Sequence, residues 1–254
     1  MHIVDQILYR VLGLQVNLYA CEARLEAGTD PEALHDLRIA VRRLRSLLHP
    51  LRAHESVLLI RNSAAAVGQL TTPVRDLEVL ATELERRGAI EAAAIRRASL
   101  RELYLEVLGS PELDRLFMSL DLWPSDFRSS ERDGDFANIE LKISRQLKKQ
   151  INKLSVALHT KTHDPHELRL LTKRLRYGSE AYPKLSPVTS DSFQLLRAAQ
   201  SALGDWHDRY QWCVRANEEA DLQELVPEWQ QESERYLADA ELTLGKLSAL
   251  IKTH

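Results

Sequence analysis

Apolar residues recur at intervals of three and four along almost the whole chain, and this spacing constrains the fold most strongly. It places apolar side chains on one face of an α-helix, whereas a half-buried strand would need strict alternation. The abundance of leucine, alanine, glutamate and arginine also favours helix, and no convincing series of short β-branched strands interrupts the pattern. We therefore expect an all-α protein.

The pattern divides the chain into helical stretches on both sides of a polar segment. The segment is "WPSDFRSSERDGDF", residues 123–136, which we expect to be a linker inside a single domain spanning residues 1–254. The first helical repeat would be residues 1–122 and the second residues 137–254. The expected helices are residues 3–27, 31–53, 55–70, 73–87, 89–108, 111–121, 136–160, 165–182, 190–203, 205–222 and 227–251.

An internal repeat links the two halves. "HDLRIAVRRLR" (residues 35–45) matches "HELRLLTKRLR" (residues 166–176) at six of eleven positions, with an offset of 131 residues. At an offset of 132, "VRDLEVL" falls over "WHDRYQW" and pairs Arg75 with His207. Each basic segment follows an Asp-Pro pair, which suits a helix start because Asp caps and Pro fits the first turn. The chain is therefore expected to contain two copies of one helical unit.

Each copy separates its cations from its leucines. A helical residue advances by about 100°, so the basic positions of the first copy fall within roughly 80° of one another. We call them the first stripe: His35, Arg38, Arg42, Arg45 and His49. The opposite face is apolar and consists of Leu37, Ala40, Val41, Leu44, Leu47, Leu48 and Leu51.

The second copy repeats this layout. Its second stripe is His166, Arg169, Lys173 and Arg176, opposite an apolar face made of Leu168, Leu171, Leu175 and Tyr182. Arg43 and Arg174 point away from the stripes, where they could contact a different partner or pair with an acid such as Asp76 or Asp208.

Like charges at three- and four-residue spacing destabilise a helix by about 0.2–0.5 kcal/mol per pair. A solvated helix face usually relieves this with interleaved acids, but the first stripe has none and the second meets only Glu180, one turn beyond Arg176. The pattern therefore favours an anion, and arginine suits phosphate oxygens through its planar fork. A linear stripe fits a linear polyanion better than one compact phosphate.

Two further groups of basic residues could extend the site. Arg145, Lys149 and Lys153 share a spacing of three or four in "LKISRQLKKQINKL", and a solvated face explains them equally well. Arg75 lies within "GQLTTPVRDLEVL" (residues 68–80), which follows the first stripe, and Arg61 precedes this segment. The alternative for both is an ordinary surface or salt-bridge role.

The histidines admit several interpretations. His35 and His166 head the two stripes and could contact phosphate, could be structural, or could accept a phosphoryl group from a partner kinase. The His-Asp pairs at residues 35–36 and 207–208 suggest a metal-dependent phosphohydrolase as an alternative. Against it, Asp36 points about 100° away from His35 on the same helix, so the two side chains do not share a face. No H-E-x-x-H motif or similar pair is present.

Other function classes lack their signatures. There is no P-loop, dinucleotide-binding glycine motif, nucleophile elbow or zinc-type cysteine and histidine spacing. The formal net charge of −3 argues against a uniformly basic nucleic-acid binder. No apolar run is long enough to span a bilayer, and no export signal is visible. We expect a cytoplasmic protein without cofactors, with Cys21 and Cys213 as free thiols.

The two blocks "HDLRIAVRRLR" and "HELRLLTKRLRY" resemble the CHAD family, named for its histidines in an α-helical domain. The resemblance covers essentially the whole chain. It implies two helical bundles, of about four main helices each, related by a pseudo-twofold axis around a central basic groove or pore. It also implies binding of inorganic polyphosphate, and in some members association with polyphosphate granules.

The resemblance carries binding roles over to ten residues, which are His35, Arg38, Arg42, Arg43, Arg45, His166, Arg169, Lys173, Arg174 and Arg176. Possible additional contacts are His49, Arg75, Arg145, Lys149, Lys153 and His207. No E-x-E-x-K signature of a fused CYTH domain is present, so no catalytic role transfers. We therefore expect a non-catalytic polyphosphate-binding protein. The alternatives are a phosphohydrolase or phosphotransfer protein that uses His35, His166 or His207, and a nucleic-acid binder.

Overall fold

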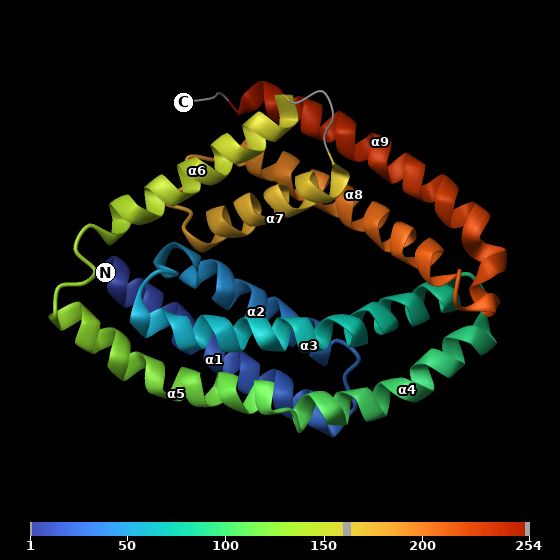
Figure 1. Ribbon diagram of the computed structural model, residues 1–254, viewed down its shortest axis with the longest axis horizontal. Helices are drawn as coiled ribbons and strands as arrows, with labels where there is room; N and C mark the ends of the chain where they lie inside the picture. The colour runs from blue at the N-terminus through green and yellow to red at the C-terminus, as the bar shows by residue number, and fades with distance from the viewer. Residues whose placement is uncertain (1, 160–163, 252–254) are drawn as a thin grey trace. The chain divides into compact units, whose positions relative to one another are not determined.

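The computed structural model describes residues 2–159 and 164–251, and every regular element in these ranges is helical (Figure 1). This confirms the all-α prediction. The elements are α1 (Ile3–Ala27), α2 (Ala33–Leu48), η1 (His49–Leu51), α3 (Glu55–Arg86), α4 (Ile90–Leu108), α5 (Pro111–Arg132), α6 (Ile139–His159), α7 (Pro165–Ala181), α8 (Ser190–Arg215), η2 (Ala220–Leu225) and α9 (Val226–Leu250). No helix in the described part of the chain is long and apolar enough to cross a membrane.

The chain forms two compact units, Met1–Glu140 and Leu141–His254. We call them unit 1, which contains α1 to α5, and unit 2, which contains α7 to α9 and nearly all of α6. Each basic stripe therefore belongs to a different unit, the first on α2 and the second on α7.

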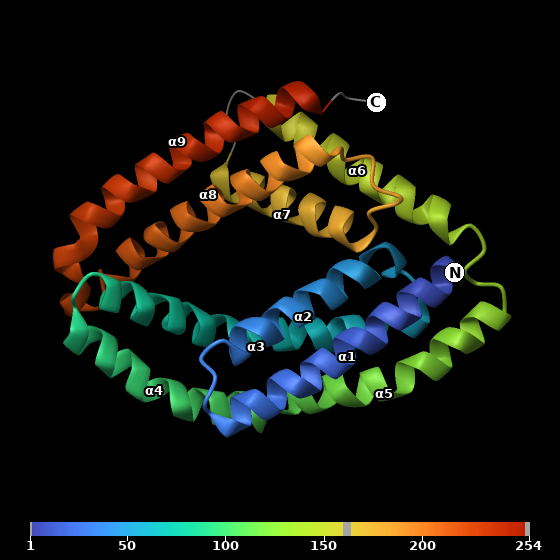
Figure 2. The ribbon, with the colours of Figure 1, turned by 180° about the vertical axis from the view of Figure 1, so that it is seen from behind.

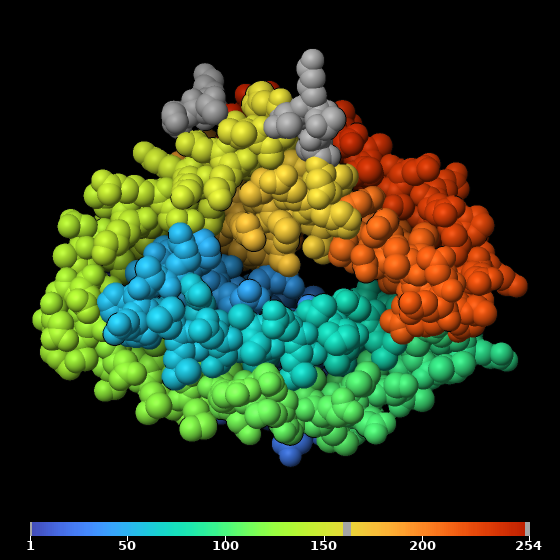
Figure 3. All heavy atoms as spheres, viewed as in Figure 1, coloured from blue at the N-terminus to red at the C-terminus, as the bar shows by residue number. Residues whose placement is uncertain are grey.

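Unit 1 is built around the long helix α3. On one side, α3 packs against α2, which also packs against α1, and Figure 2 shows α1 and α2 side by side. On the other side, α3 packs against α4 and α5, whose atoms lie directly against it in Figure 3. One buried cluster joins the end of α1 and the start of α2 to α3 and α4 through Leu25, Leu34, Leu77 and Leu100.

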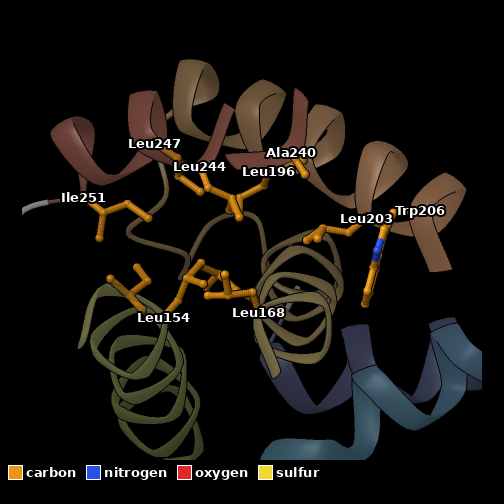
Figure 4. Close-up of a cluster of buried hydrophobic side chains, with 12 residues drawn as sticks. Leu154, Leu168, Leu196, Leu203, Trp206, Ala240, Leu244, Leu247 and Ile251 are labelled. Atoms are coloured by element: carbon orange, nitrogen blue, oxygen red, sulfur yellow. The ribbon is translucent and has the colours of Figure 1, made fainter. Parts of the chain in front are cut away.

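Unit 2 encloses a core between its four long helices (Figure 4). Leu154 of α6 and Leu168 of α7 face Leu196 and Leu203 of α8 across this core, and Leu244 of α9 closes it. Burying a leucine side chain contributes about 1.5–3 kcal/mol, so this cluster fixes α7 against α8.

Three expected helix breaks are absent. Helix α3 continues through Pro73, α5 continues through Pro124 to Arg132, and α8 continues through Gly204. The sequence predicted ends there because proline and glycine weaken helices. Buried residues on both sides of each position hold the helix together instead, as Trp123 and Phe127 do around Pro124. The prediction that residues 123–132 lie outside a helix is therefore wrong.

Several helix ends follow the predicted signals. Helix α7 begins at Pro165, and the side chain of its N-cap Asp164 accepts a hydrogen bond from the His166 N–H at 2.9 Å. The parallel start of α2 lies at Ala33, two residues after the predicted Pro31. There, Asp30 accepts from the Glu32 N–H and also binds the Arg24 guanidinium, so its carboxylate fixes the turn before the helix.

Candidate anion-binding site

The apolar face predicted for α2 is its buried face. Leu37, Leu44 and Leu48 are fully buried, and all seven predicted apolar positions belong to the core. The α7 face is thinner, because Leu168, Leu175 and Tyr182 are buried whereas Leu171 is only partly covered. Both stripes are thus excluded from the cores that hold their helices.

Arg38 is fixed against α3 by one end of its guanidinium group. Its Nη1 donates to the Thr71 hydroxyl at 2.8 Å, to the Thr72 hydroxyl at 3.2 Å and to the Gly68 carbonyl at 3.2 Å. These contacts use a single nitrogen, so the orientation of the guanidinium is set while its Nε and Nη2 donors make no hydrogen bond to the residues described. Burial is the main cause that lowers the pKa of Arg38, and the neighbouring cations Arg42 and Arg75 add to it.

Arg45 also lies over Gly68. Its Nη1 is 3.2 Å from the position that a Cβ atom would occupy on this glycine. The residue as a whole is exposed, but its guanidinium end is desolvated against α3, and this burial lowers the pKa of Arg45. The charges of Arg42 and Arg61 lower it further, and no acid among the residues that the structure describes contributes an opposing shift.

His35 at the head of the first stripe faces Arg75. Burial lowers the pKa of His35 first, the charge of Arg75 second, and Arg42 also contributes. Arg75 itself donates to the buried Glu78 carboxylate at 2.8 Å, and Glu78 accepts from the Tyr104 hydroxyl at 2.5 Å. The candidate Arg75 is therefore held in an ion pair beside His35.

The remaining candidates of unit 1 differ in exposure and position. Arg42 is half-buried in the middle of the first stripe and Arg43 is exposed beside it. His49 lies at the end of the stripe, in η1.

In the second stripe, Arg176 is held by contacts to α8 and to its own helix. Its Nε donates to Gln200 Oε1 of α8 at 2.5 Å, and its Nη1 pairs with Glu180 at 3.1 Å. Its guanidinium carbon also lies 3.9 Å from the centre of the Tyr177 ring. Arg169 and Lys173 are half-buried, whereas Arg174 is exposed and forms no ion pair with the residues that the structure describes.

A ring cluster surrounds the start of α7. The His166 ring centre is 4.7 Å from that of Trp206 and 5.4 Å from that of His207, which it meets edge-on. Burial, the largest cause, and the charges of Arg169, His166 and Lys173 together lower the pKa of His207 to about 4. The His207 Nδ1 is buried and has no hydrogen-bond partner among the described residues.

The weak second match of the repeat has a structural counterpart. Arg75 acts on His35 within unit 1 as His207 contacts His166 within unit 2. Arg75 and His207, which the repeat pairs at an offset of 132 residues, are therefore each a neighbour of the histidine that begins the stripe of their own unit.

The α6 candidates lie apart from the core-facing side of their helix. Arg145, Lys149 and Lys153 are exposed, whereas Ile143 and Leu147 of the same helix are buried. This placement agrees with a solvated face, and their role in binding stays a prediction.

A metal-dependent phosphohydrolase would need a cluster of side chains that could hold its metal. Within residues 2–159 and 164–251, no three His, Cys, Asp or Glu side chains are grouped so that they could hold an ion. The Asp36 carboxylate pairs with Arg24 of α1 at 2.9 Å, on the side away from the first stripe. Cys21 and Cys213 are free thiols, as predicted.

The contacts that sequence reasoning missed come from the helix that follows each stripe. Thr71 and Gly68 of α3 orient Arg38, and Gln200 of α8 holds Arg176. Their identities could be read from the sequence, but the spacing within a helix does not reveal which residues of a neighbouring helix face it.

The molecule is thus an all-α protein with two helical units, each presenting an arginine-rich helix headed by a histidine. Comparison with known protein families matches residues 13–217 to the CHAD domain, so the chain belongs to the CHAD domain family. No curated protein sequence matches it.

Solved structures share the fold. The CHAD domain from the plant Ricinus communis is 24% identical, with a TM-score of 0.69 over 98% of this chain and 90% of that one. PptA from Streptomyces chartreusis is 17% identical, with a TM-score of 0.66 over 95% of this chain and 99% of that one.

Proposed function

We propose that this protein binds inorganic polyphosphate through the first and second stripes and does not catalyse its turnover. The observation that carries the proposal is the cationic environment of the first stripe, where the charge of Arg42 lowers the pKa values of both Arg38 and Arg45 and the stripe residues include no acid. Such a group of cations is costly unless an anion neutralises it. Family membership supports polyphosphate as that anion.

The chemistry of the stripes supports a chain of phosphates. Successive cations three or four residues apart are spaced by about 4.5–6 Å along a helix axis, so each can meet a different group of an extended polyanion. Arginine forms two parallel hydrogen bonds to phosphate oxygens, which gives geometry as well as charge. A cytoplasmic location and association with polyphosphate granules are part of this proposal.

Charge reversal in each stripe tests the proposal. We expect Arg42→Glu and Lys173→Glu to remain helical and together to abolish binding of size-fractionated sodium polyphosphate in calorimetric titrations. Lys246→Glu is the matched control, because it makes the same charge change at an exposed position of α9 in unit 2. Unchanged affinity in the double variant would show that the stripes are solvated faces.

Two other measurements separate the alternative functions. A phosphohydrolase would carry stoichiometric metal after purification and release phosphate from polyphosphate over time. A nucleic-acid binder would bind duplex DNA or RNA as tightly as polyphosphate at matched charge, from low to physiological salt. We expect neither result, and we expect polyphosphate affinity to fall steeply with salt as counterions are released.

A further inference from the structure

Arg45 and Arg176 occupy equivalent places in the two copies, but different residues face them. Gly68 lies under Arg45, and Gln200 accepts a hydrogen bond from Arg176. These two facing residues are 132 apart, the offset that also pairs Arg75 with His207. The helix after each stripe thus has glycine at this position in unit 1 and a hydrogen-bonding side chain in unit 2.

This difference changes what each arginine can offer a ligand. In unit 2, the Arg176 guanidinium bonds Gln200 and Glu180 and covers the Tyr177 ring, and its side chain is only 14% exposed. In unit 1, no hydrogen bond or ion pair joins Arg45 to any residue in the described ranges, and the charges that lower its pKa are those of the cations Arg42 and Arg61.

Gly68 also brings a second arginine to the same place. Its carbonyl accepts from Arg38 Nη1 at 3.2 Å, and Arg45 Nη1 lies 3.2 Å from the point that a Cβ atom on this residue would occupy. Arg38 and Arg45 are seven residues apart on α2, or about 10 Å along its axis, yet both guanidinium groups reach one residue of α3. Their convergence places two guanidinium groups near Arg42, with Arg61 also near Arg45.

We infer that the first stripe makes the dominant phosphate contacts, that Arg45 and Arg38 donate them with Arg61 as a further contact, and that Gly68 is the positioning residue that keeps Arg45 available. The inference rests on the proposed function and makes it asymmetric, because the repeat by itself would give both stripes equal weight. In the second stripe, binding through Arg176 would first have to break its hydrogen bond to Gln200.

The matched pair Arg45→Gln and Arg176→Gln tests this asymmetry in the full chain. With size-fractionated sodium polyphosphate as the probe, we expect Arg45→Gln to weaken affinity at least about tenfold, since it removes a charged hydrogen-bond contact. Arg176→Gln should weaken it no more than about threefold. Arg45→Gln should also reduce the slope of log affinity against log salt by about one, and Arg176→Gln should reduce it by less.

Gly68→Gln, which copies the residue of unit 2, tests the positioning role. We expect it to weaken affinity as Arg45→Gln does, and we expect the double variant to be no weaker than either single variant, because both act through the same contact. If Gly68→Gln fails to fold, the Arg45 and Arg176 pair still decides the inference.

The outcomes distinguish this inference from the proposal on which it rests. A wild-type protein that does not bind polyphosphate would overturn both. Wild-type binding together with equal losses from Arg45→Gln and Arg176→Gln, or a larger loss from the latter, would overturn the asymmetry alone. Circular dichroism and thermal unfolding of each variant would show that the comparison is made between folded proteins.

Discussion

At the scale of single residues, His207 is a neutral imidazole surrounded by cations. Its pKa is about 4 in the folded chain, against 6.5 for the ordinary side chain. Between these values the unfolded state binds more protons, so the free energy of unfolding falls as the pH falls from about 6.5 to about 4. Because one pKa unit corresponds to about 1.4 kcal/mol, we expect a loss of roughly 3 kcal/mol, measurable by denaturant unfolding across this range.

His207→Gln is the control for this prediction, since it keeps a neutral polar side chain that does not titrate. The difference in pH dependence between wild type and this variant isolates His207 from His35, whose pKa is lowered in the same direction. A bound polyanion would partly neutralise Arg169 and Lys173, so the pKa of His207 should rise when polyphosphate is added. An NMR titration showing an unchanged or lower pKa would contradict binding at the second stripe.

At the scale of helices, Pro73 is a helix-breaking residue inside a continuous helix. It is exposed on α3 and has no N–H to donate to the carbonyl of the preceding turn. Thr71 and Thr72 donate their hydroxyls to the Val67 and Gly68 carbonyls at 2.8 Å. Two carbonyls of the turn before the proline thus accept side-chain hydroxyls.

We expect Pro73→Ala to raise the free energy of unfolding by roughly 1–3 kcal/mol, because proline is about 3 kcal/mol less favourable than alanine in a helix interior. Thermal and denaturant unfolding would measure the change. Lower stability would instead show that the helix needs a local bend at this point, and polyphosphate affinity would then report whether that bend positions Arg75 and Arg38.

The helices also show how far the sequence could predict this fold. Periodicity predicted which faces of α2 and α7 are buried, and Asp164-Pro165 predicted where α7 begins. Proline and glycine misled the prediction at Pro73, Pro124 and Gly204, because local propensity is weaker than the burial of residues on both sides. The stripes could be predicted because they lie on one helix, whereas the partners of Arg38 and Arg176 depend on packing between helices.

At the scale of the whole molecule, the net charge of −3 conceals two concentrated cationic faces. Each lies in a unit with its own buried core, so each stripe can be altered without removing the packing that holds the other. A single polyphosphate chain that contacts both stripes would turn the second contact into an intramolecular step, and affinity would then depend on chain length.

We expect long polyphosphate to bind wild type at least about 10²-fold more tightly than tripolyphosphate, which has fewer phosphates than either stripe has basic side chains. Arg42→Glu and Lys173→Glu should each remove most of this gain, because one intact stripe cannot provide a second contact. Titrations of the three proteins with both ligands would measure this gain. A long chain can also bind one stripe in many equivalent positions, and the single variants show how much of the gain comes from that effect alone. If either variant keeps the full gain, each stripe binds its own polyphosphate chain, and the two halves of the repeat act independently.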